Sequence, residues 1–213
     1  MNALITALAD FALAGSCLIF SWKLWTQHAP NRSLNNSFFG LFLSTAVAAL
    51  AGGLRHSTPW PSASAALSIL NSSIIILAGV AGYNVWLIDA QLLFSNERFL
   101  RVARWVFRLL FVIYLFLVWR HAHGFTAAIV GYAPAAVILI VIATLRAMHA
   151  KNRFYFFGVA GLLLCVLAAW VEIKLINVQP IFLTHDILYD LLQGFGLWGV
   201  YLFGSRVSRL KSL

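Results

Sequence analysis

Seven long apolar stretches divide this chain, and they constrain its fold more than any other feature of the sequence. They cover residues 3–25, 36–55, 65–94, 102–119, 124–146, 153–177 and 183–205. A membrane-spanning helix needs about 20 predominantly apolar residues, and the 213 residues of the chain suffice for seven such spans with short connections. We therefore expect a single domain, residues 1–213, that is an all-α membrane protein built as a seven-transmembrane helix bundle.

Charged side chains are scarce, which argues against a soluble protein. They make up 10% of the residues, whereas soluble domains carry roughly a quarter. The net charge of +9 would indicate nucleic-acid binding in a soluble protein, but basic residues near helix ends are also what orients a membrane protein. We expect membrane lipids as partners, and no nucleic acid.

The basic residues are distributed unevenly between the two sides of the predicted membrane domain. Of the 15 lysine and arginine residues, only Arg55, Arg120 and Lys174 lie on one side. The positive-inside rule places the richer side in the cytoplasm. Because seven is an odd number of spans, the N-terminus is then expected outside and the C-terminus in the cytoplasm. The expected location is the inner, cytoplasmic membrane of a bacterium.

Polar residues from several stretches are expected to meet near the outer side. His56 ends the second stretch, Asn71 lies near the start of the third, and Glu172 lies late in the sixth. The seventh stretch opens with the polar segment from Thr184 to Gln193. Ionisable residues are costly inside lipid and usually serve a function there, so this grouping predicts a site.

Asp186 and Asp190 are the most informative pair, because a spacing of four residues places both on one helix face. Two such carboxylates repel each other, so the pair needs a proton, a cation or a basic partner. A metal ion is one such cation, with His56 contributing an imidazole ligand. The structural alternative is that Asp186 caps the last helix. Asp190 would then pair with one of three basic residues: Arg55, Arg120 or Lys174.

Two motifs resemble those of known seven-span proteins. The segment Gly52 to His56 reads G-G-L-R-H, and the segment His185 to Gln193 reads H-D-I-L-Y-D-L-L-Q. They are similar to G-G-x-x-H and H-N-x-x-(Y/F)-H-x-x-Q in a family of uncharacterised bacterial seven-span proteins. More distantly, they resemble the alkaline ceramidase and adiponectin-receptor (CREST) superfamily. That superfamily holds zinc near one membrane face through a histidine in span two and an H-x-x-x-H pair in span seven.

The resemblance implies a membrane-embedded, metal-dependent hydrolase acting on a lipid amide or ester. The divalent metal, zinc in the superfamily, would be held here by His56, Asp186 and Asp190. Asp190 takes the place of the second histidine of the pair, and Asp186 the place of the first, with His185 next to it. A metal in this position would acidify a water molecule and polarise a carbonyl group.

The remaining polar residues are assigned to the chemistry around the metal. His185 or Glu172 is expected to shuttle a proton, and Tyr189 or Asn71 to steady the oxyanion. The lipid substrate would enter laterally between the helices.

Two other functions are left open. One is a non-enzymatic receptor, sensor or partner protein with a degenerate metal site. The other is a small transporter. Metal content would distinguish the hydrolase from the receptor, and a continuous polar path through the bundle would indicate a transporter.

Overall fold

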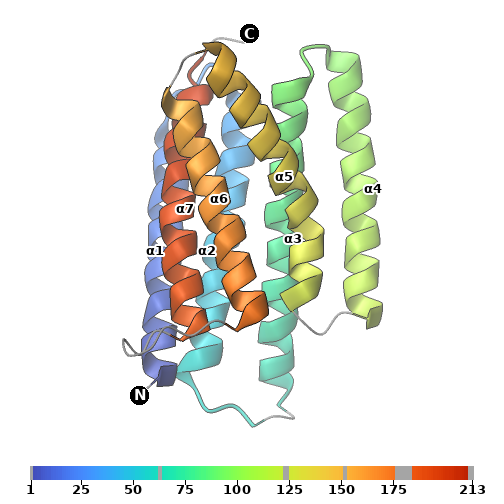
Figure 1. Cartoon of the computed structure of the whole chain (residues 1–213). Coiled ribbons are helices and arrows are strands. Elements are labelled where there is room, and N and C mark those ends of the chain that lie inside the picture. The colour runs from blue at the N-terminus through green and yellow to red at the C-terminus, as the bar shows by residue number, and fades with distance from the viewer. Residues whose placement is uncertain (1, 62–63, 122–124, 151–152, 176–183, 211–213) are drawn as a thin grey trace.

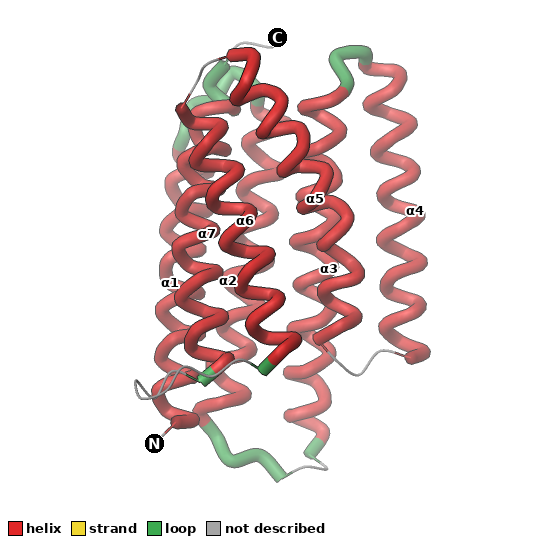
Figure 2. The backbone as a smooth tube through the Cα atoms, viewed as in Figure 1, coloured by secondary structure: helices red, strands yellow, loops and turns green. Residues whose placement is uncertain are grey.

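The computed structural model describes residues 2–61, 64–121, 125–150, 153–175 and 184–210. These residues form seven helices, and no strand occurs among them (Figures 1 and 2). The helices are α1 (Asn2–Thr26), α2 (Arg32–Ser57), α3 (Ala65–Leu93), α4 (Glu97–His121), α5 (Phe125–Ala150), α6 (Arg153–Lys174) and α7 (His185–Val207).

The predicted apolar stretches correspond one to one with these helices. Two helices begin earlier than predicted, α2 at Arg32 and α4 at Glu97, because hydropathy marks only the apolar part of a helix that continues into polar turns. The side chain of Asn31 caps α2 by accepting a hydrogen bond from the backbone N–H of Leu34 at 3.0 Å, which stabilises this early start. Predicted positions 124, 176–177 and 183 lie outside the described residues.

Six of the seven described helices, α1 to α6, are long and apolar enough to cross a membrane. The chain is therefore an all-helical membrane protein. Helix α7 is different because Asp186, Asp190 and Gln193 fall in its first half. Four glycines in the same helix lower its hydropathy further: Gly194, Gly196, Gly199 and Gly204.

The helices other than α4 form a closed ring. Each packs against the next in the order α1, α2, α3, α5, α6, α7, and α7 packs against α1. Helix α4 packs on the outside of this ring, against α3 (Figure 1). The ring therefore encloses an interior that α4 does not reach.

Helices α6 and α7 approach each other closely because glycines face each other across their interface. A Cβ atom added at Gly196 would lie 2.6 Å from the carbonyl oxygen of Gly161, and one added at Gly199 would lie 2.7 Å from that of Phe157. Contacts this short leave room for hydrogen atoms only, as is typical of tightly packed membrane helices.

The two ends of the ring are filled differently. The last turn of α7 and the α1–α2 and α3–α4 connections lie at one end, here called the C-terminal end, and the N-terminus and the α2–α3 connection lie at the other, the N-terminal end (Figure 1). Large buried side chains occupy the half near the C-terminal end, including Phe38, Phe42 and Phe203. Bulky side chains thus fill much of the ring on that side.

Candidate functional site

A cavity of about 410 Å³ lies within the ring and is lined by all six ring helices. Its ionisable lining residues lie toward the N-terminal end, among them Asp10, His56 and Asp186. Its deeper lining is apolar apart from Thr45 and includes Ala81, Val85, Ala136, Leu162, Leu197 and Val200. The cavity therefore has a polar mouth and an apolar depth, a shape that suits an amphipathic ligand.

Four carboxyl groups gather at this mouth. Asp10 in α1, Glu172 in α6 and Asp186 in α7 all interact electrostatically with Asp190, one turn further along α7. Asp190 is 6% exposed, so its carboxyl group is almost wholly inside the bundle. Arg55 supplies positive charge to Asp10 and Glu172. The mouth as a whole is strongly acidic in a protein whose net charge is +9.

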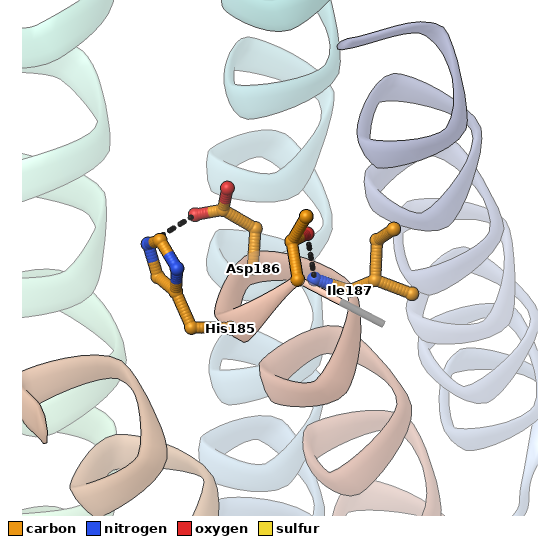
Figure 3. Close-up of polar contacts among 4 residues, drawn as sticks. His185, Asp186 and Ile187 are labelled. Carbon is orange, nitrogen blue, oxygen red and sulfur yellow. Dashed lines mark hydrogen bonds and ion pairs between the residues drawn. The ribbon is translucent and has the colours of Figure 1, made fainter. Parts of the chain in front are cut away.

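In the first turn of α7, the Asp186 side chain does not cap the helix. Thr184 caps the helix, and its hydroxyl accepts a hydrogen bond from the backbone N–H of Ile187 at 3.5 Å (Figure 3). The structural alternative, in which Asp186 caps the helix, is therefore wrong. The Asp186 carboxylate instead lies with its Oδ1 atom 3.4 Å from Nε2 of His185 (Figure 3).

Glu172, His185 and Asp186 form the tightest group of metal-binding side chains among the described residues. One ligand atom from each lies within 4.8 Å of the other two. Metal–ligand bonds run from roughly 2.0 to 2.6 Å, so three atoms at this spacing fit around one ion. The Oε2 atom of Glu172 is buried and has no hydrogen-bond partner among the described residues, which leaves it available to a ligand.

The predicted metal ligands His56, Asp186 and Asp190 all line the cavity. Asp186 interacts electrostatically with each of the other two. Only Asp186, however, belongs to both this set and the tightest group. The assignment of His56 and Asp190 as ligands stays a prediction.

The predicted catalytic residues lie in the same region. Glu172, Tyr189 and Asn71 line the cavity, and His185 lies beside Glu172 and Asp186. They come from α3, α6 and α7, so the fold brings together residues that are far apart in the sequence.

The sequence prediction left two residues out of the site: Asp10 and Gly52. Asp10 is the one acidic residue of a largely apolar helix, and that isolated carboxyl group was the only signal available for it. A Cβ atom added at Gly52 would lie 2.9 Å from Oδ1 of Asp10. The first glycine of the G-G-x-x-H segment therefore makes room for the Asp10 carboxylate beside α2, one turn from His56.

The comparison with known families covers nearly the whole chain. Residues 5–209 match a family described as a family of unknown function, DUF6962. The chain belongs to this family. The match spans all seven helices and agrees with the expected membership of a family without an assigned function. No curated protein and no solved structure matches the chain, so the resemblance to the ceramidase and adiponectin-receptor superfamily stays a prediction.

Proposed function

We propose that this protein is a membrane-embedded, metal-dependent hydrolase acting on a lipid amide or ester. One observation carries the proposal: three metal-binding side chains converge at the polar mouth of a cavity whose depth is apolar. A lipid amide or ester has the same arrangement, with a polar carbonyl group at the end of an apolar chain.

Glu172, His185 and Asp186 are the residues that would hold a divalent ion, zinc being the ion suggested by the resemblance. They offer carboxylate oxygens and an imidazole nitrogen, which are accepted zinc ligands. When bound, the ion would supply Lewis acidity toward a carbonyl oxygen and would acidify a water molecule. His56 lies near Asp186 and is available as a further ligand or as a proton carrier.

The remaining polar residues bind and orient the substrate. Tyr189 and Asn71 line the mouth on α7 and α3 and would donate hydrogen bonds to the carbonyl oxygen of the substrate. If Glu172 and His185 hold the ion, Asp190 would accept the proton that the acidified water releases, since it is buried and interacts electrostatically with Glu172. A carboxyl group in this place can accept a proton without exposing it to bulk water.

The apolar depth of the cavity would hold the acyl chain. Ala81, Ala136 and Leu197 present only methyl and methylene groups there. A substrate that comes from the bilayer would exchange contacts with lipid tails for contacts with these side chains, so the apolar depth would accommodate the acyl chain without a large hydrophobic gain. The substrate would enter laterally from the bilayer between two helices of the ring.

The proposed orientation follows from the charge distribution. We propose that α7 is the seventh span, that the N-terminus is outside, and that the protein resides in the bacterial cytoplasmic membrane. The site then faces the outer side, because Arg55, Arg120 and Lys174 are the only basic residues at the N-terminal end.

The metal content of purified protein tests the proposal. Zinc should copurify with the wild type at close to one ion per chain. The variants Glu172→Gln and Asp186→Asn should retain it at least about tenfold less tightly, since even residues behind the ligands cost that much when replaced. The matched control is Asp89→Asn, a carboxyl group in the other half of the bundle. Hydrolysis of short-chain lipid amides and esters is measured on the same samples.

The outcomes separate the competing functions. Metal retention together with hydrolysis, both lost in the two site variants, supports the proposal. Metal retention without hydrolysis of any amide or ester would favour the receptor instead. A wild-type protein without metal, purified in the absence of chelators and inactive after addition of zinc, would overturn the proposal.

A further inference from the structure

The first half of α4 carries four arginines on one face of the helix. Arg98, Arg101, Arg104 and Arg108 follow one another at spacings of three, three and four residues, which keeps them on the same side. At a rise of 1.5 Å per residue they extend over about 15 Å of the helix. Orienting a span needs basic residues only near its end, whereas Arg104 and Arg108 lie about two and three turns inside α4.

No carboxylate in the described part of the chain pairs with these arginines. Among the described residues the one ion pair is that of His185 with Asp186, at the opposite end of the bundle. Of the six acidic residues in the chain, only Glu97 is exposed near the arginines, and it forms no ion pair in the described part of the chain. The four positive charges are therefore available to a counter-charge from outside the protein.

The arginines lie beside exposed apolar side chains of the same helix. Arg104 reaches toward the start of α2, with its Nη2 atom 3.4 Å from Oγ of Ser33, so the basic face borders the corner between α4 and α2. The guanidinium carbon of Arg108 lies 4.9 Å from the centre of the Trp105 ring. Trp105 itself is 64% exposed, and Leu109 beyond it is also exposed. Charged groups thus lie directly beside an apolar surface that faces the bilayer.

We propose that the arginine face of α4 binds the phosphate headgroup of an anionic phospholipid in the leaflet at the C-terminal end of the bundle. Guanidinium groups bind phosphate oxygens through paired hydrogen bonds. The exposed apolar side chains of α4 would lie against the acyl chains of the same lipid. This site is separate from the cavity, because α4 contributes none of the cavity lining, and it does not depend on the proposed hydrolase activity.

Native mass spectrometry of the full chain tests this proposal, with phosphatidylglycerol and phosphatidylcholine as competing probes in mixed detergent micelles. The wild type should retain phosphatidylglycerol in preference. Replacing two arginines, Arg101→Gln with Arg108→Gln, should weaken that retention by roughly 30-fold, which corresponds to about 1 kcal/mol for each basic residue removed. The matched control, Lys23→Gln with Arg206→Gln, removes the same charge at the same end on α1 and α7 and should retain the lipid like the wild type.

A third double variant distinguishes the effect of lost charge from the effect of a damaged fold. Arg101→Lys with Arg108→Lys keeps both charges and should retain more phosphatidylglycerol than the glutamine pair. If the Lys23 and Arg206 control lost as much phosphatidylglycerol as the glutamine pair on α4, the effect would be one of general charge, and the proposed site would be wrong. A lysine pair that behaves like the glutamine pair would also overturn it, as would a wild type that retains both lipids equally.

Discussion

Two aspartates, Asp89 and Asp190, show how differently one residue type can be placed in the same bundle. Asp190 lines the cavity and lies among other polar groups. Asp89 is 1% exposed, and neither of its carboxyl oxygens has a hydrogen-bond partner among the described residues. It lies one turn beyond Val85, on the face of α3 that lines the cavity. Among the described residues, no arginine forms an ion pair with Asp89.

Replacing Asp89 with leucine should stabilise the protein. A buried carboxyl group without partners loses its hydration and gains nothing in return, at a cost of about 1–3 kcal/mol. Asp89→Leu should therefore raise the free energy of unfolding in detergent by about that amount, as measured by denaturant titration followed by circular dichroism. A lower free energy of unfolding would show that Asp89 has a partner, such as a bound water or ion.

Replacing Asp190 with histidine tests how far the metal site extends. The change restores the second imidazole of the related span-seven motif. Because Asp190 lies one turn from Asp186 and interacts with it electrostatically, we expect Asp190→His to raise the affinity for zinc. Competition with a fluorescent zinc chelator measures this affinity. An unchanged affinity would mean that position 190 is beyond the reach of an ion held by Glu172, His185 and Asp186.

At the scale of the helices, the α6–α7 interface depends on glycine at particular positions. Gly196 leaves no room for a side chain, because an added Cβ would lie 2.6 Å from both the carbonyl oxygen of Gly161 and the sulfur of Cys165. Gly194, two residues away on the same helix, meets nothing closer than a methyl group of Leu13 at 3.8 Å. These two positions therefore form a matched pair.

Gly196→Ala should separate the two helices and lower the free energy of unfolding by about 1–3 kcal/mol. Gly194→Ala should leave it unchanged or raise it by up to about 1 kcal/mol, since alanine is the better helix former. Thermal unfolding of both variants in the same detergent measures the difference. Equal effects would contradict the close contact between α6 and α7.

Hydropathy predicted the helices well because each one contains a long apolar stretch. It did not predict where α2 and α4 begin, since capping by Asn31 and the basic first turns of α4 depend on hydrogen bonds and charge rather than on apolar character. It also did not predict which helices adjoin. Every span presents apolar residues to its surroundings, so α4 outside the ring looks like any other span in the sequence.

At the scale of the whole molecule, the orientation predicted from the distribution of lysine and arginine can be measured directly. A fluorescent protein fused after Leu213 should fluoresce, and alkaline phosphatase fused there should be inactive, because the C-terminus is expected in the cytoplasm. Fusions after Pro59, in the α2–α3 connection, should behave in the opposite way. Active phosphatase after Leu213 would reverse the orientation and place the cavity mouth on the cytoplasmic side.

The candidate site was predicted in part, for a reason that lies in the topology. Alternate helix ends meet at one side of a bundle, so His56, Glu172 and Asp186 were expected near one another, and all three line the cavity. Which of them share one small volume depends on how the helices rotate about their own axes. That rotation is set by contacts such as Asp10 against Gly52, and no spacing within a single helix encodes it.

The position of α4 has a consequence for the symmetry of the chain. Helices α3 and α5 are neighbours in the ring, and the one crossing made by α4 between them means that they run in the same direction, as do α7 and α1. The ring therefore consists of two triplets, α1–α2–α3 and α5–α6–α7, that start at the same end and follow each other in the same sense. In ring order and helix direction, a half-turn would put α1 in the place of α5, α2 in that of α6 and α3 in that of α7. Under this rotation His56, near the end of α2, corresponds to Glu172, near the end of α6. The mouth of the cavity thus draws His56 and Glu172 from helices that hold corresponding places in the two triplets.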